Sequence, residues 1–218
     1  MKKVAIGCLI VAGVLIVVLG IGGFLLYRAA SPFIAGVRQL AEIPEIEKTI
    51  ANTASFEPPA SGELTEEMVK RFATVQEAVE AKLSGRVNEL RTKVDQIDKA
   101  IKEQNRKASP TEVLSALSGL ATLVVEGKRA QVEAINKARF SRREYLWVRR
   151  QVYQAAGLTL TELSLGDPQA LAQAAQNSGE LTREVTKPDA EVPARNKELV
   201  APYQAKLKEW LAFGMVGL

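Results

Sequence analysis

Arginine and aromatic side chains are concentrated between residues 137 and 153, in the stretch KARFSRREYLWVRRQVY. The stretch has six basic residues and one acidic residue. Such a combination can stack on nucleic-acid bases and bind their phosphates, or it can bind an anionic lipid head group or an envelope polymer. A structural interpretation is an amphipathic bundle helix whose arginines pair with acidic side chains of residues 65–105. The candidate surface for an anionic partner consists of Arg139, Arg142, Arg143, Trp147, Arg149, Arg150 and Tyr153.

The spacing within this stretch predicts which of its side chains face inward. At 100° per residue, Tyr145, Val148 and Val152 fall on one face of a helix. The arginines spread over the other side, around Leu146 and Tyr153. We therefore expect a buried apolar face and an exposed arginine side.

Side chains suited to catalysis or metal binding are scarce. The chain has no histidine and a single cysteine, Cys8. Ser-His and Cys-His nucleophile pairs are therefore absent, as is the commonest metal ligand. The sequence contains no G-x-x-x-x-G-K-[ST], G-x-G-x-x-G, G-x-S-x-G, C-x-x-C or H-E-x-x-H motif. We expect a protein that is not an enzyme and that uses no cofactor, with a hydrolase based on carboxylates alone as the catalytic alternative.

The N-terminal region contains 24 consecutive residues without a charge, Val4–Tyr27. A bilayer core of about 30 Å requires roughly 20 apolar helical residues, so this stretch is long enough to span. A cleaved signal peptide is the alternative, but its apolar core is usually shorter, and Pro32 disfavours cleavage after the small residues that precede it. We expect an uncleaved, single-pass transmembrane anchor over residues 1–28, with Cys8 as a small apolar residue inside it.

The orientation of this anchor is predicted from few charges. Lys2 and Lys3 precede the span, which favours a cytoplasmic N-terminus under the positive-inside rule. Residues 29–218 would then lie on the extracytoplasmic side, which is the periplasm in a Gram-negative bacterium. Nucleic acid is disfavoured as a partner in that location. Protein partners in the envelope, and an anionic lipid or polymer, remain as alternatives.

Two long helices are predicted after the anchor. Thr65 is the expected N-cap of the first, in which apolar residues recur at steps of three and four as far as Ile101. Ser109-Pro110-Thr111-Glu112 combines an N-cap, a proline in the first turn and a capping-box glutamate, so a second helix begins there. The short turn between them predicts an antiparallel pair within the chain, with an intermolecular coiled coil as the alternative. Whether residues 110–156 form one helix or two stays open, because Ser141 could cap a new helix.

The C-terminal part contains a polar linker and a last helix. We expect a short helix over residues 167–176 and a loop from Thr182 to Val192. The last helix opens at Pro193 and is bent or delayed by Pro202. The apolar tail after it, residues 213–218, is expected to be buried in the bundle or inserted at a surface. Trp147 and Trp210 are expected in the core.

The sequence thus predicts an all-α protein with one N-terminal transmembrane helix and an extramembrane bundle of three to four helices. Its expected role is that of an accessory, scaffold or assembly subunit of a bacterial-type envelope complex, acting through helix–helix contacts. The alternative is a membrane-tethered binder of an anionic ligand, lipid surface or polymer through residues 137–153. The oligomeric state is not predicted.

The expected segments are the anchor (1–28), a juxtamembrane segment and linker (29–64), a helical hairpin core (65–157), a polar linker with a short helix (158–192) and a C-terminal amphipathic helix (193–218).

Overall fold

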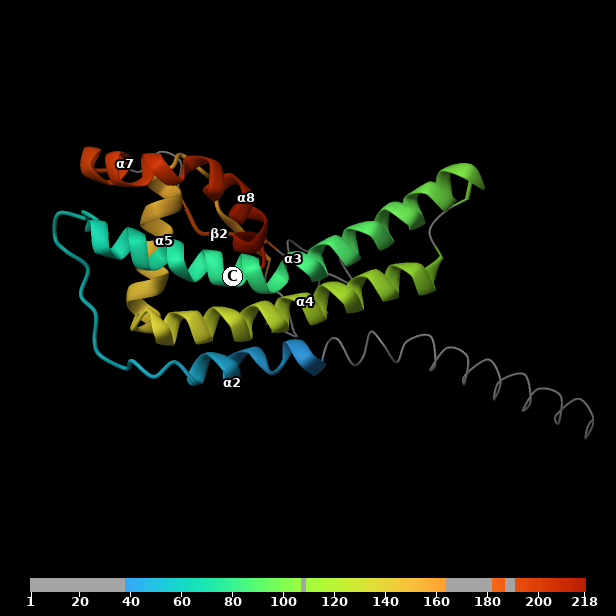
Figure 1. The fold of residues 1–218 in the computed structure, drawn as a ribbon, viewed down its shortest axis with the longest axis horizontal. Coiled ribbons are helices and arrows are strands. Elements are labelled where there is room, and N and C mark those ends of the chain that lie inside the picture. The colour runs from blue at the N-terminus through green and yellow to red at the C-terminus, as the bar shows by residue number, and fades with distance from the viewer. Residues whose placement is uncertain (1–37, 107–108, 164–181, 187–190) are drawn as a thin grey trace, which may run out of the picture.

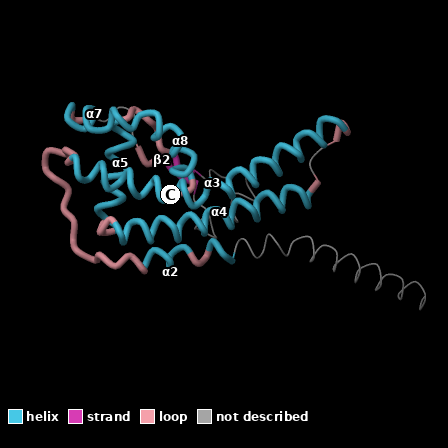
Figure 2. The backbone as a smooth tube through the Cα atoms, viewed as in Figure 1, coloured by secondary structure: helices cyan, strands magenta, loops and turns pink. Residues whose placement is uncertain are grey.

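The computed structural model describes residues 38–106, 109–163, 182–186 and 191–218. Helices dominate this part of the chain, with one short two-stranded antiparallel sheet (Figures 1 and 2). The elements are α2 (Ile43–Lys48), α3 (Glu66–Glu103), α4 (Pro110–Lys137), α5 (Arg142–Ala155), β1 (Thr161–Leu163), β2 (Thr182–Glu184), α7 (Ala194–Val200), the 3-10 helix η1 (Ala201–Tyr203) and α8 (Gln204–Met215).

Helices α3 and α4 form a long antiparallel hairpin, and the other described elements lie toward one end of it (Figure 1). We call that end the head. The rest of the hairpin, residues 84–103 of α3 and 110–120 of α4, is called the arm. The two helices begin as predicted. The Thr65 hydroxyl accepts a hydrogen bond from the Met68 amide at 3.2 Å, and Ser109 and Glu112 form a complete capping box.

The predicted all-α class is confirmed for the described residues, with two differences in detail. Six α-helices and one 3-10 helix occur in the described residues, rather than three to four helices. One reason is that α4 and α5 are separate, because Arg139 adopts a left-handed conformation (φ 57°) and Ser141 caps a new helix. A second is that Pro202 lies in η1, which divides the last helix into α7 and α8.

The second difference is a pair of strands within residues 158–192. Thr161–Leu163 pairs with Thr182–Glu184, so the predicted loop from Thr182 to Val192 is wrong at its start. The short helix expected over residues 167–176 lies outside the described residues.

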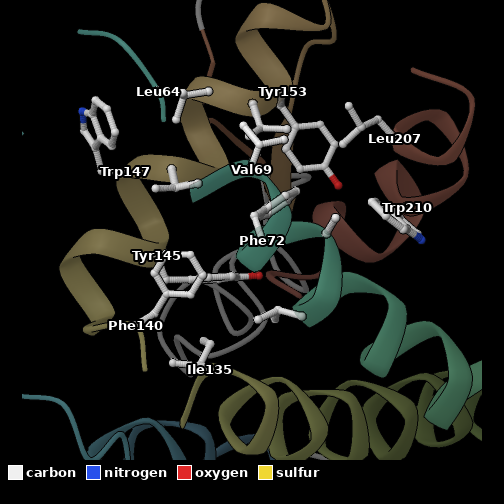
Figure 3. Packing of buried hydrophobic residues seen from close by; sticks show 14 of the residues in the cluster. Leu64, Val69, Phe72, Ile135, Phe140, Tyr145, Trp147, Tyr153, Leu207 and Trp210 are labelled. Carbon is white, nitrogen blue, oxygen red and sulfur yellow. The ribbon is translucent and has the colours of Figure 1, made fainter. Parts of the chain in front are cut away.

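The main apolar core of the head lies between α3, α5 and α8 (Figure 3). Phe72 of α3 faces the rings of Tyr145 and Tyr153 of α5, with centroid separations of 6.0 and 6.1 Å. Phe140 packs edge-on against Tyr145 at 5.8 Å. Trp210 of α8 is fully buried on the opposite side of Phe72. These rings account for much of the apolar burial that holds three segments of distant sequence together.

The C-terminal tail is buried in the hairpin, which selects the first of its two predicted environments. The side chain of Leu218 is fully buried in a cluster with Val79 and Leu83 of α3. Gly127 of α4 makes room for it, because a Cβ at that position would overlap the leucine side chain. The preceding carbonyl, of Gly217, accepts a hydrogen bond from an α4 lysine at 2.6 Å.

The expected membrane span, Val4–Tyr27, lies outside the described residues. Among the helices that the structure describes, none is both long and apolar enough to cross a bilayer. The juxtamembrane segment is described from residue 38 onward, and it packs on the hairpin. Leu40 is buried against Ala121, Val124 and Val125 of α4, and α2 continues along the same helix (Figure 1).

Candidate interaction surfaces

The arginine-rich helix α5 is fixed at its N-terminal end by a local cap and by a contact with α3. The Ser141 hydroxyl accepts a hydrogen bond from the Glu144 amide at 3.2 Å. The Glu144 carboxylate in turn forms an ion pair with Arg71 of α3 at 2.8 Å. The Arg71 guanidinium also lies 3.8 Å from the centroid of the Phe140 ring, a favourable cation–π distance. Sequence and packing therefore agree on where α5 begins.

The seven residues of the predicted anionic-partner surface do not form one surface. Three of them are buried, because the head elements pack on a side of α5 that the helical periodicity assigned to solvent. The exposed members are Arg139, Arg142, Arg143 and Arg150, and the buried members are Trp147, Arg149 and Tyr153.

Each of the three buried members has a place in the head. The ring of Trp147 contacts that of Phe56 in the 49–65 linker, with 5.5 Å between centroids. Arg149 donates a hydrogen bond to the carbonyl of Gly214 in α8 at 2.7 Å. Burial raises the pKa of the Tyr153 hydroxyl far above its usual range, so it remains a neutral phenol. Both Trp147 and Tyr153 are therefore unable to stack on a base or to contact a surface ligand.

The structural interpretation of the arginines is also only partly right. It expected acidic partners in residues 65–105, but Arg142 pairs with Glu47 of α2 at 2.8 Å. Glu47 also lies 3.2 Å from the ammonium of Lys128. Burial raises the pKa of Glu47, but Lys128 and Arg142 outweigh that effect and hold the pKa below its usual range. Arg142 therefore belongs to an internal ion-pair network that attaches α2 to α4 and α5.

A shallow hollow of about 370 Å³ lies beside this network, between the start of the linker and the start of α5. Exposed cationic groups on its lining come from Lys48, Arg142 and Arg143. Thr53 and Ser55 contribute hydroxyl groups. The sequence did not indicate this hollow, because it joins segments that lie far apart in the chain.

A second hollow, of about 270 Å³, lies where the arm leaves the head. Leu90 of α3 and Leu123 of α4 supply apolar lining, and Gly119 allows close approach, since a Cβ there would be 3.0 Å from the Leu90 Cδ1. Its charged lining consists of Arg86, Glu89, Lys93 and Glu126. Arg86 bridges the two helices, 3.3 Å from Glu126. We call this second hollow the arm hollow. It was not predicted from the sequence.

The arm differs from the head in how little it buries. In the head, α3 has five fully buried side chains between Phe72 and Leu83. Of the arm residues whose side chains are described, none is buried. Val87, Leu90, Ile97 and Ile101 are each half-buried, at the seam between the two helices. Two helices alone leave part of an apolar seam exposed, and no other described element lies along most of the arm (Figure 1).

The described residues contain no group of three or more histidine, cysteine, aspartate or glutamate side chains placed to hold a metal ion. Comparisons with protein-family models, with curated proteins and with solved structures each found no match. The features of the described residues that bear on function are the arm, the arm hollow and the exposed arginines of residues 139–150.

Proposed function

We propose that this chain is a non-catalytic, membrane-tethered assembly subunit of an envelope complex, and that the arm binds a helical segment of a partner protein. The tether is the uncharged stretch Val4–Tyr27. Its flanking lysines favour an extracytoplasmic head and arm, in the periplasm of a Gram-negative bacterium.

The observation that carries the proposal is the contrast between the two ends of one hairpin. The head already has a complete apolar core, whereas the arm buries none of its described side chains fully. A two-helix arm gains little stability by itself, because helical stability in proteins comes mainly from tertiary packing. A third helix laid along the seam would bury partly exposed residues such as Leu90 of the arm and Leu123 beside it.

The arm hollow also supports a specific orientation of the partner helix. Cations and carboxylates stand side by side on its lining, with Arg86 and Lys93 close to Glu89 and Glu126. A partner helix that crosses here needs apolar residues at its centre and charges of both signs at its edges. Charged residues at the edge of an interface contribute more to specificity than to affinity.

Purification from native membranes in a mild detergent tests the proposal. The wild-type chain should carry a stoichiometric protein partner. A double charge reversal at the hollow, Lys93→Glu with Glu126→Lys, should release that partner while the net charge stays at +4. The matched control is Lys208→Glu with Glu209→Lys, which reverses two exposed charges on α8.

The control variant should retain the partner. Isolation of the wild-type chain as a monomer without a partner would contradict the proposal. So would retention of the same partner by the arm variant, since the contact would then lie elsewhere.

A further inference from the structure

The exposed side of α5 carries Arg143, Arg150 and an exposed apolar residue, and a third exposed arginine, Arg139, precedes the helix. Leu146 is 40 % exposed, and it is the one large apolar side chain in the described residues with that degree of exposure. Arg143 and Arg150 lie at positions i−3 and i+4 from it, so they flank it on the same helical face. We call these four residues the outer face of α5.

The positive charge of this face has no ion-pair partner in the part of the chain that the structure describes. Arg139, Arg143 and Arg150 make no side-chain hydrogen bond or ion pair to any part of the chain that the structure describes. The nearby acidic groups point inward: Glu144 pairs with Arg71, and Glu47 is held by Lys128 and Arg142. Among the described residues, the outer face therefore presents cations that are free to pair with an anionic group of another molecule.

The hollow beside α5 adjoins this cationic surface, and Arg143 belongs to both. The other two cations on its lining are paired within the protein, Lys48 with Glu45 at 2.7 Å and Arg142 with Glu47 at 2.8 Å. A phosphate group could approach Arg143 and the hydroxyl of Ser55 from solvent. Arginine binds phosphate through a planar fork of donors, which makes it well suited to such a group.

The apolar and aromatic side chains beside these arginines indicate which class of partner the outer face can bind. Nucleic acid is disfavoured, because Trp147 and Tyr153, the aromatic rings of this helix that could stack on bases, are buried. A leucine between exposed arginines is instead suited to a bilayer interface, where the leucine enters the acyl boundary and the arginines reach the head groups. We propose that the outer face of α5 docks the head on the anionic lipid surface of the membrane that holds the tether.

This contact would be weak in isolation, and it rests on the proposed tether for its effect. Each arginine near an anionic surface contributes about fivefold to binding, so three give about a hundredfold. A head that is already tethered meets the surface at a high effective concentration. Docking would then fix which way the arm points from the membrane.

Full-length protein in lipid nanodiscs provides the test. An environment-sensitive fluorophore is attached at Leu146→Cys, in a Cys8→Ser background that removes the single native cysteine. In phosphatidylglycerol discs we expect a blue-shifted emission and protection from iodide quenching. Both should be lost in phosphatidylcholine discs, in high salt and in the triple variant Arg139→Gln, Arg143→Gln, Arg150→Gln. A probe at the exposed Lys208 of α8 is the control and should stay accessible in both lipids.

The triple variant should fold normally, because none of its arginine side chains has an internal partner among the described residues. Tryptophan emission of the head checks this. Equal iodide quenching at position 146 in both lipids, or protection that survives in the triple variant, would overturn the docking. A chain that fails to enter nanodiscs would contradict the tether instead; mixing the same labelled protein with preformed phosphatidylglycerol vesicles would then test the outer face directly.

Discussion

A pair of identical substitutions on α3 should separate the stability of the head from that of the arm. Val75 is fully buried in the main core of the head, whereas Val87, further along the same helix, is half-buried where the arm begins. Changing either to alanine removes the same two methyl carbons and gives the same gain in helix propensity. The difference between the two variants therefore reports burial.

The expected magnitudes follow from that burial. Removing two buried carbons costs about 1.6 kcal/mol of transfer free energy, and the cavity left behind raises the loss for Val75→Ala to about 2–3 kcal/mol. Val87→Ala should cost about 1 kcal/mol, because part of its side chain is already in contact with water and a smaller cavity is left.

Urea unfolding followed by tryptophan emission is the appropriate assay, because Trp147 and Trp210 both lie in the head. Detergent-solubilised full-length chain should show a clear decrease in the free energy of unfolding for Val75→Ala and a small one for Val87→Ala. Equal losses for the two variants, or a larger loss for Val87→Ala, would refute the division into a packed head and a thinly packed arm.

Three further substitutions test the connections that hold the head together. Leu218→Ala empties a fully buried position and should lower the free energy of unfolding by about 2 kcal/mol or more in the same urea assay. Asn196→Ala leaves the amide of Leu64 and the carbonyl of Gly62 without their partner, which should cost about 1–3 kcal/mol. Glu47→Gln should destabilise the head at pH 7. Since the folded-state pKa of Glu47 is lowered, its contribution is present above its unfolded pKa and is lost as the pH falls through the folded value. The free energies of unfolding of the wild-type chain and the Glu47→Gln variant should therefore approach each other as the pH falls from the unfolded pKa of about 4.3 through the lower, folded-state pKa.

The features that could be predicted from sequence are those set by neighbouring residues. The N-caps at Thr65 and Ser109, and the alternative start at Ser141, depend on side chains within four positions of the helix start. Gly157 has a positive φ of 68° after α5, as expected for a residue that ends a helix. Local chemistry of this kind needs no knowledge of the tertiary fold.

Features decided by contacts between distant segments could not be predicted in the same way. Helical spacing alone would pair Arg71 with Glu67 and Lys93 with Glu89. In the structure, Arg71 pairs with Glu144 of α5, and Lys93 donates a hydrogen bond to a serine hydroxyl of α4 at 2.6 Å. Helical periodicity predicts an exposed Arg149, because it identifies a single apolar face of the helix. Packing of α8 against α5 buries a second side of that helix.

The same reason explains why both hollows were missed. Each is lined by segments that become neighbours only after the hairpin and the linker have folded. Sequence reasoning did identify the arginine-rich stretch, but only its exposed members can form a surface. The apolar residues of the α3 seam, and the second helix that packs on them, could be predicted from the sequence. The spacing did not indicate that the two helices would leave these residues partly exposed in the arm.

Site-specific photo-crosslinking in native membranes is the most direct test of the proposed function. A benzophenone side chain replaces Glu89, an exposed residue of the arm hollow, and in a second strain it replaces Glu209, an exposed residue of α8. The proposal predicts one dominant protein adduct from position 89, with a mass that matches the co-purified partner, and none from position 209. Absence of an adduct at position 89, or the same adducts from both positions, would contradict a partner-binding arm.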